Sequence, residues 1–158
     1  MIHLEDVTMD IFQEFIALSV NETQTKYVAS SLISLAQAYV QNSSQTARVE
    51  VKAIYHNDDL IGYTEVKYVL KDNSAYYDLH RFMIDKAYQG YGYGNKAFQV
   101  VMDYIKTMPL GNATKVILEY MPENVAASHI YHSYGFIDTD QMNKFGEIKA
   151  EFMLSDEK

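Results

Sequence analysis

Hydrophobic side chains recur every three or four positions in the N-terminal third of the chain, which is the spacing of helices with one buried face. Residues 8–20 predict a first helix, with Thr8 or Asp10 as its N-cap. After a polar break at residues 21–24, residues 27–39 predict a second helix. The side chains expected to face the core are Ile11, Phe12, Phe15, Ile16 and Leu18 in the first helix and Leu32, Leu35, Ala36 and Tyr39 in the second.

The pattern changes to alternation in the middle of the chain, as in strands with one buried face. Residues 48–55 and 60–70 alternate polar and apolar side chains around a polar turn at residues 56–59, and they therefore predict a β-hairpin. A second turn, at residues 71–74, leads into a strand predicted over residues 75–85. A short segment in which every second residue is glycine follows this strand.

The C-terminal half contains both spacings. Residues 95–105 predict a helix that ends before the breakers Pro109 and Gly111. A short buried strand, a helix stopped by Gly135 and two closing strands around a Phe145-Gly146 turn follow. The predicted segments are residues 115–120, 124–134, 136 onward and 148–154. The whole order predicts one mixed α+β layer sandwich rather than a doubly wound sheet.

The composition is that of a single domain. Of the 158 residues, 48% are hydrophobic and 13% aromatic, which is enough for one substantial core and too little for two ordinary domains. We therefore expect one domain over residues 1–158. No apolar run approaches the roughly 20 residues of a membrane helix, and the N-terminal segment carries acids where a secretory signal has basic residues. The sequence predicts a cytoplasmic protein with no membrane partner.

Charge and cysteine content narrow the chemistry. The 21 acidic and 13 basic residues give a net charge of −8, which disfavours nonspecific binding of nucleic acid and favours the approach of a cationic partner. An ordinary solvated surface is the alternative explanation of this balance. The absence of cysteine excludes disulfides, thiolate metal sites and a covalent thiol intermediate. We expect no metal.

Gly90, Gly92 and Gly94 alternate between the strand predicted over residues 75–85 and the helix predicted over residues 95–105. Unpaired backbone N–H groups at such a junction bind phosphate, together with the positive end of the helix dipole. The spacing does not fit the G-x-G-x-x-G dinucleotide loop or the Walker A loop. A potassium-channel filter is excluded because the sequence predicts no membrane helices. A flexible turn without a ligand is the alternative.

Two segments together resemble the GNAT superfamily of N-acetyltransferases. Gln89, Gly92 and Gly94 match its Q/R-x-x-G-x-G/A loop. About 30 to 40 residues downstream, the segment "ENVAASHIYHSYGF" matches its N-x-x-A-x-x-x-Y-x-x-x-G-F pattern. The matching positions there are Asn124, Ala127, Tyr131, Gly135 and Phe136. The resemblance extends over nearly the whole chain and is closest to bacterial spermine and spermidine acetyltransferases.

This resemblance implies the GNAT acyl-CoA N-acyltransferase fold, a mixed central sheet flanked by helices, with acetyl-CoA as the cofactor. In the family the loop amides hold the pyrophosphate, and the preceding strand pairs with the pantetheine arm. Asn124 could bind near the pantetheine, cap its helix, or do both. The residues that the resemblance assigns to acetyl-CoA are Phe82, Met83, Ile84, Gln89, Gly90, Tyr91, Gly92, Tyr93, Gly94, Asn95, Asn124, Ala127 and Tyr131.

Acetyl transfer to an amine requires a base, because an alkylamine is mostly protonated at pH 7. The chain has no cysteine and no Gly-x-Ser-x-Gly elbow, so we expect direct attack in a ternary complex rather than a covalent acetyl-enzyme. By resemblance, Tyr131 is the general acid that protonates the departing thiolate. The alternative for Tyr131 is a core tyrosine, in a chain with 14 tyrosines.

His80 is the predicted base because imidazole titrates in the useful range. Related polyamine acetyltransferases often place a carboxylate at this strand position. Alternation along the strand predicts that Asp78 and Phe82 share the face of His80. Asp78 could therefore orient or replace His80, and Glu119 could act through a water molecule. A structural histidine is the alternative.

The break between the first two helices contains Glu22, Gln24 and Tyr27, where the acceptor pocket closes in the family. Acidic and aromatic groups suit a polyamine, although a solvated loop explains them as well. With Asp78 and Glu119 they form the predicted substrate site. The resemblance thus implies acetyl transfer from acetyl-CoA to a primary amine of spermidine or spermine. The alternatives are a protein N-terminus, lysine or drug amine as acceptor, or a non-catalytic coenzyme A-binding sensor or structural module. A homodimer is expected by resemblance.

Overall fold

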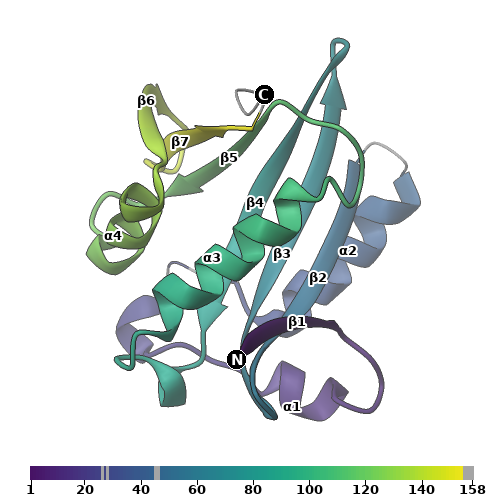
Figure 1. Ribbon diagram of the computed structural model, residues 1–158, viewed down its shortest axis with the longest axis vertical. Helices are drawn as coiled ribbons and strands as arrows, with labels where there is room; N and C mark the ends of the chain where they lie inside the picture. Colours follow the sequence, from purple (N-terminus) through teal and green to yellow (C-terminus); the bar gives the residue numbers. More distant parts are fainter. Residues whose placement is uncertain (26, 28, 45–46, 155–158) are drawn as a thin grey trace.

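The computed structural model describes residues 1–25, 27, 29–44 and 47–154 (Figure 1). The strands are β1 (Ile2–Asp6), β2 (Ala47–His56), β3 (Asp59–Lys71), β4 (Ser74–Ile84), β5 (Lys115–Tyr120), β6 (Ile137–Met142) and β7 (Ile148–Met153). The helices are α1 (Phe12–Ile16), α2 (Ser31–Ser44), α3 (Tyr93–Lys106) and α4 (Val125–Tyr134), with 3-10 turns η1 (Glu22–Gln24) and η2 (Lys86–Tyr88). The order is the predicted mixed α+β order with one strand added at the N-terminus.

The strands within the described ranges form a seven-stranded sheet in the order β1-β2-β3-β4-β5-β7-β6. Neighbours pair antiparallel except β4 and β5, which pair parallel. The connection from β4 to β5 contains α3, which lies across one face of the sheet, while α2 lies on the other face (Figure 1). The prediction of a mixed central sheet flanked by helices is confirmed.

The larger core lies between the sheet and α3. The hydrophobic residues of α3 recur at helical spacing, so one side of the helix is apolar and packs against strand residues such as Val66 and Leu118. The side chains that α3 buries are Ala97, Phe98, Val101, Met102 and Ile105. On the opposite face Phe15 of α1 packs against Tyr63 of β3, with ring centroids 5.5 Å apart. The two cores hold the central strands rigidly from both sides.

The N-terminal segment differs from the prediction in two ways. The strand β1, which is too short for alternation to identify, pairs with β2 along its whole length. The helix predicted over residues 8–20 is limited to α1, because Ser19 makes long-range bonds instead of helical ones. The Ser19 N–H donates to Asp85 Oδ1 at 2.8 Å, and its carbonyl accepts from the Lys86 N–H at 2.8 Å.

The buried face predicted for the second helix is wrong except at Leu35, which packs against the core. The helix α2 begins at Ser31, and it leaves Leu32 and Tyr39 exposed. The Ser34 hydroxyl bonds to the buried hydroxyl of Tyr63 at 3.0 Å. The Tyr63 hydroxyl already donates to the Ala29 carbonyl at 2.6 Å, so it is the buried Ser34 hydroxyl that needs partners at this face, and Tyr63 and the Ser30 carbonyl supply them. The side chains that α2 buries are Ser31, Ser34 and Ala38.

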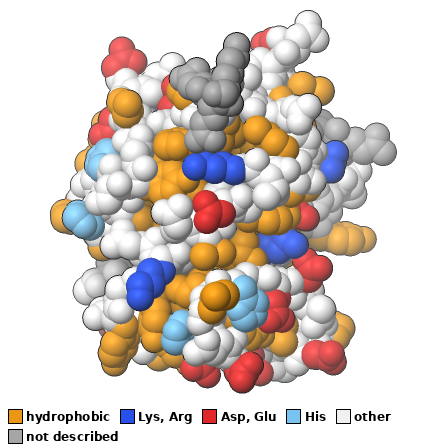
Figure 2. Space-filling model, viewed as in Figure 1, with side chains coloured by type: hydrophobic (Ala, Val, Ile, Leu, Met, Phe, Trp, Pro, Cys, Tyr) orange, Lys and Arg blue, Asp and Glu red, His pale blue; other side chains and the backbone are white. Residues whose placement is uncertain are grey.

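The surface over α3 has mixed charge. Figure 2 shows Lys and Arg side chains scattered among acidic and hydrophobic ones on this face, without a continuous patch of one sign. Within the described ranges, no helix has the length and apolar character needed to cross a membrane.

Candidate active site

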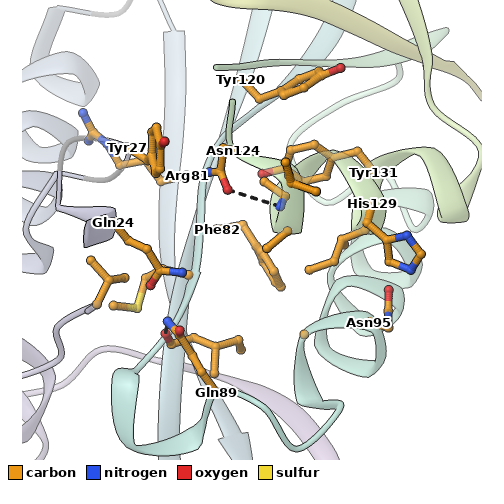
Figure 3. A pocket seen from close by; sticks show the side chains of 18 of the residues that line it. Gln24, Tyr27, Arg81, Phe82, Gln89, Asn95, Tyr120, Asn124, His129 and Tyr131 are labelled. Carbon is orange, nitrogen blue, oxygen red and sulfur yellow. Dashed lines mark hydrogen bonds between the residues drawn. The ribbon is translucent and has the colours of Figure 1, made fainter. Parts of the chain in front are cut away.

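A cavity of about 530 Å³ lies between β4, the loop after β4, the first turns of α3 and α4, and the segment around η1 (Figure 3). This volume suits a small-molecule site. The predicted site residues that line it are Gln24, Tyr27, His80, Phe82, Met83, Ile84, Gln89, Gly90, Gly92, Gly94, Asn95, Asn124, Ala127 and Tyr131. The predicted residues that do not line it are Glu22, Asp78, Tyr91, Tyr93 and Glu119.

The cavity forms where β4 and β5 diverge. The two parallel strands pair only at Tyr77 with Val116 and at Asp78 with Ile117, although both continue for several residues. Beyond Asp78 the backbone of β4 is therefore not hydrogen-bonded to β5. This arrangement leaves strand-edge N–H and C=O groups available beside the cavity, which a ligand with amide groups can use.

A β-bulge lies on β4 at the point of divergence. On the β3 side, Leu79 pairs with Val66 and Arg81 pairs with Glu65, so His80 is an extra residue without an opposite partner. The bulge exchanges the two faces of β4 beyond His80. Bulges of this kind re-aim side chains next to active sites.

The bulge contradicts the prediction that Asp78, His80 and Phe82 share one face. Leu79 packs in the core under α3, so its neighbour Asp78 points to the opposite face. Phe82 points toward α3, where its ring lies 5.3 Å from the ring of Phe98. Simple alternation is wrong here because the extra residue shifts it by one position.

The structure gives two reasons why the loop contains glycine at these positions. Gly90 and Gly92 have φ values of +86° and +82°, which side chains other than glycine rarely adopt, and a Cβ at either position would meet nothing within 4 Å. A Cβ at Gly94 would lie 3.0 Å from Ile130 Cδ1, so this glycine allows α3 to approach α4. The open space above Gly90 and Gly92 belongs to the cavity.

The N-termini of α3 and α4 both border the cavity, and α3 begins directly after Gly92. The first turns of α3 and α4 contain no acidic residue, so no carboxylate of their own neutralises the positive ends of the helix dipoles. Asn124 caps α4, because its Oδ1 accepts from the Ala127 N–H at 3.3 Å (Figure 3). The predicted cap is confirmed, while a contact of Asn124 with pantetheine stays a prediction. This end of the cavity favours an anion.

Tyr131 presents its hydroxyl to the cavity, whereas the neighbouring Tyr120 does not. In Figure 3 the Tyr131 hydroxyl points inward and that of Tyr120 points away. The Tyr120 hydroxyl donates to Asp138 Oδ1 at 2.9 Å, and the two tyrosine rings lie 5.7 Å apart. Burial, and then the nearby Glu147 and Tyr120, raise the pKa of Tyr131 to about 12. The phenol therefore holds its proton throughout the neutral pH range.

His80 borders the cavity with 36% of its side chain exposed. Burial, together with the nearby cations Lys67 and Arg81, lowers the pKa of His80 to about 4. The imidazole is therefore neutral at pH 7, but it does not titrate in the neutral range, so the reason for predicting His80 as the base is wrong. Because this pKa lies below that of an unfolded chain, His80 makes the folded protein less stable as the pH falls from about 6.5 toward 4.

Asp78 lies beside His80 without a direct hydrogen bond, since its Oδ2 is 3.9 Å from His80 Nδ1. Burial raises the pKa of Asp78 to about 6. Its stability contribution has the opposite sign to that of His80: it is present at low pH and is lost as the pH rises through about 6. The nearby charges that act on this pKa are Lys67, which lowers it, and Glu119, Glu65 and Glu147, which raise it.

Three polar residues that the sequence analysis does not single out also line the cavity: Arg81, Tyr120 and Glu147. Arg81 Nη1 donates to Glu65 Oε1 at 2.9 Å, and these side chains are only 14% and 1% exposed. An acid inside the apolar run of β3 is a sequence signal for such a buried pair. Glu147 lies in the turn before β7, where acids are common, so no local signal distinguishes it.

Comparisons with known proteins agree with this geometry. Residues 15–136 match the model of the acetyltransferase (GNAT) family. A probable spermine N(1)-acetyltransferase of Bacillus subtilis subsp. natto (strain BEST195) is 24% identical over 150 residues, covering 92% of this chain and 94% of that protein. The structure of spermidine N-acetyltransferase from Vibrio cholerae in complex with CoA and spermine matches with a TM-score of 0.71 and 18% identity, covering 98% of this chain and 96% of that one. An aminoglycoside acetyltransferase in complex with coenzyme A matches with a TM-score of 0.74 and 14% identity, covering 97% and 95%.

The fold and the cavity define an acetyl-CoA-dependent N-acetyltransferase. The chain belongs to the acetyltransferase (GNAT) family, as its two motifs predict. Acetyl-CoA is the acetyl donor of this family, and the residues present fit it. The open space above Gly90 and Gly92, at the N-terminus of α3, suits the pyrophosphate, and the unpaired edge of β4 suits the amides of the pantetheine arm.

Replacing Gly92 by Ala is expected to weaken coenzyme A binding by roughly tenfold or more, because the added methyl group occupies the space assigned to the pyrophosphate. Isothermal titration calorimetry measures the change. Gly146→Ala is the matched control, since Gly146 has a φ of +84° and equally open surroundings but does not line the cavity. Equal coenzyme A affinity in the two variants would contradict the assignment of the loop.

Proposed function

We propose that the chain transfers the acetyl group of acetyl-CoA to a primary amine of a polyamine such as spermidine or spermine. The observation that carries this proposal is a pair of carboxylates at one side of the cavity, Glu147 in the lining and Glu119 next to it, which we call the acidic side. Glu147 lines the cavity, and Asn143 Nδ2 donates to Glu147 Oε1 at 2.8 Å and to Glu119 Oε2 at 3.3 Å. One neutral amide thus holds two carboxylates close together.

These carboxylates lack a cation of their own. Among the described residues, neither Glu119 nor Glu147 forms an ion pair with Lys or Arg. Glu151, in contrast, forms ion pairs with Lys115 at 2.7 Å and with Lys149 at 3.7 Å. Asp78 experiences their charge, which contributes to its raised pKa. An ammonium group bound here would relieve this repulsion, and a polyamine supplies ammonium groups besides the amine that reacts.

The related proteins support the acceptor class. The curated relative is named for spermine, and the Vibrio cholerae structure contains spermine. The aminoglycoside acetyltransferase has the same fold and a different acceptor in its name, so a drug amine is the second candidate. The acidic side of the cavity is compatible with both, since an aminoglycoside is also a polycation.

In the proposed mechanism, His80 accepts the proton of the attacking amine. Its imidazole is neutral at pH 7, but a pKa of about 4 makes it a weak base. Asp78 Oδ2 lies 3.9 Å from His80 Nδ1, so the two side chains have no direct hydrogen bond through which to share the proton. Acetyl-CoA supplies the activated thioester when it is bound. Tyr131 then donates its phenolic proton to the departing sulfur. Because the chain has no cysteine, the amine attacks directly within a ternary complex.

Spermidine is expected to react with a kcat/KM roughly tenfold or more above that of a monoamine with a neutral chain, at low ionic strength. The net charge of −8 and the acidic side of the cavity attract a polycation, and added salt screens this attraction. Release of free thiol from acetyl-CoA across an amine panel, at several salt concentrations, measures both effects.

Glu147→Gln tests the local part of this attraction, and Asp58→Asn is its control. Both changes remove one negative charge. Asp58 is exposed in the turn between β2 and β3 and does not line the cavity, so its change alters the net charge without altering the cavity. Glu147→Gln is expected to reduce the advantage of spermidine more than Asp58→Asn does. A preference that is absent, or that ignores ionic strength, would favour another acceptor.

The proposal also includes a single catalytic domain and a homodimer. Size-exclusion chromatography with light scattering tests for the homodimer. A monomer at micromolar concentration would contradict it.

A further inference from the structure

The acceptor side of the cavity and the phosphate side are joined by a direct hydrogen-bonded link. The link connects residues 19–25, which we call the acceptor segment, to the loop after β4. Ser19 N–H donates to Asp85 Oδ1 at 2.8 Å, and the Lys86 N–H donates to the Ser19 carbonyl at 2.8 Å. Asn21 Nδ2 donates to Gln89 Oε1 at 3.1 Å. These partners lie more than 60 residues apart in sequence.

Gln89 occupies the centre of this link. Its Oε1 accepts from Asn21, and its Nε2 donates to the carbonyl of Ile84 at 2.8 Å. Both ends of the motif glutamine are therefore bonded within the protein. Its side chain connects the end of β4, the glycine loop and the acceptor segment, and the loop meets a phosphate through its backbone.

The acceptor segment carries groups that face the cavity. Val20 and Gln24 line it, and Gln24 points into it from the side opposite α4 (Figure 3). Gln24 Oε1 is buried and has no hydrogen-bond partner among the described residues. A buried acceptor without a partner is costly, and an N–H donor from an amine would satisfy it.

The side chain of Asn21 is available to bond to Gln89 because it caps no helix. It precedes η1 as its N-cap residue, but its side chain makes no capping hydrogen bond. Asp85 in contrast holds both sides, since its Oδ1 accepts from Ser19 and its Oδ2 accepts from the Ala87 N–H at 3.1 Å. One side-chain contact, between Asn21 and Gln89, thus joins the acceptor segment to the glycine motif itself.

We propose that Asn21 is a positioning residue that couples the two ligand sites: coenzyme A held by the glycine loop fixes Gln89, and Gln89 fixes the acceptor segment through Asn21. Binding of coenzyme A then orders the groups that receive the amine, and the amine strengthens the binding of coenzyme A by the same factor. This inference rests on the proposed function for the identity of the amine and on the assignment of residues 19–25 to its binding.

Hydrogen exchange of the acceptor segment tests the coupling without any amine. In the wild-type protein, coenzyme A is expected to slow exchange of the backbone amides of residues 19–25. In Asn21→Ala this protection is expected to weaken over residues 21–25, because Ser19 stays bonded to Asp85 and Lys86, while the affinity for coenzyme A alone and the thermal stability stay near wild type. Thr23→Ala, an exposed change in the same segment, is the control and is expected to keep the protection.

Binding and kinetics extend the test to the amine. Coenzyme A is expected to tighten spermidine binding about fivefold to tenfold in the wild type and hardly at all in Asn21→Ala. In that variant the KM for spermidine is expected to rise while kcat changes little. Undiminished protection of residues 21–25 in Asn21→Ala, or no protection in the wild type, would overturn the coupling even if spermidine is acetylated. Protection that depends on Asn21 in a protein that turns over no polyamine would support the coupling and refute the proposed acceptor.

Discussion

Tyr131→Phe is expected to lower kcat by roughly 10²-fold or more, while the affinity for coenzyme A and the thermal stability change little. The phenylalanine ring keeps the packing against Phe98, whose ring centroid lies 5.3 Å from that of Tyr131. Only the proton for the departing thiolate is lost. Steady-state kinetics on folded protein measure the effect.

Tyr134→Phe is the matched control for this substitution. The Tyr134 ring also contacts Phe98, at 5.5 Å, but among the described residues its buried hydroxyl has no hydrogen-bond partner. Its removal is expected to leave kcat unchanged and to retain or slightly raise stability. A core role for Tyr131 predicts the reverse pattern, with altered stability and near-normal kcat in Tyr131→Phe.

The pH dependence of kcat gives a second test of Tyr131. Because burial helps to raise the pKa of Tyr131 to about 12, loss of its proton should not lower kcat in the wild type below about pH 10. A fall in kcat near pH 8 that disappears in Tyr131→Phe would contradict the environment described for this phenol.

Arg81→Ala is expected to reduce the free energy of unfolding by about 3–5 kcal/mol, because it leaves the buried carboxylate of Glu65 without its cation. The two side chains are 2.9 Å apart and almost inaccessible, and Glu65 Oε2 has no partner among the described residues even in the intact pair. Burial already raises the pKa of Glu65, and removal of Arg81 should raise it further. Urea unfolding at neutral pH measures the loss.

Two further variants test whether the unpaired buried charge of Glu65 causes the loss of stability in Arg81→Ala. Lys115→Ala removes a partly exposed partner of Glu151, with side chains 29% and 27% accessible, and should cost under about 1 kcal/mol. Arg81→Met combined with Glu65→Leu removes both charges and should recover most of the stability lost in Arg81→Ala. If Arg81→Ala costs no more than Lys115→Ala, the buried pair does not contribute as described.

The elements that the sequence predicts correctly are those that local patterns determine. Long alternating runs identify β2, β3 and β4, and helical spacing up to the breakers Pro109 and Gly111 identifies α3. Gly90 and Gly92 also follow from a local requirement, since their positive φ values need glycine. The family motifs then place the cavity between β4 and α4 before any coordinates are known.

The remaining features depend on contacts between distant residues. The serine face of α2 can be buried because the Phe15 carbonyl and the Tyr63 hydroxyl, both on other elements, bond to its hydroxyls. The helix α1 ends early because Ser19 bonds to Asp85. The bulge at His80 depends on pairing with β3, and it reverses the faces that alternation predicts. Glu147 enters the cavity only because the turn before β7 brings it there. No periodicity within a single segment reports such contacts.

The cavity between β4 and α4 is expected to transfer an acetyl group directly from acetyl-CoA to an amine, with polyamines as the acceptor class. Mass spectrometry of the amine and of the protein, alongside release of free thiol, tests it most directly. We predict that spermidine gains one acetyl group for each thiol released, and that the mass of the protein stays unchanged when acetyl-CoA is present without amine. Tight coenzyme A binding with no acetylation of any amine in the panel, or a protein that carries an acetyl group before amine is added, would contradict the account.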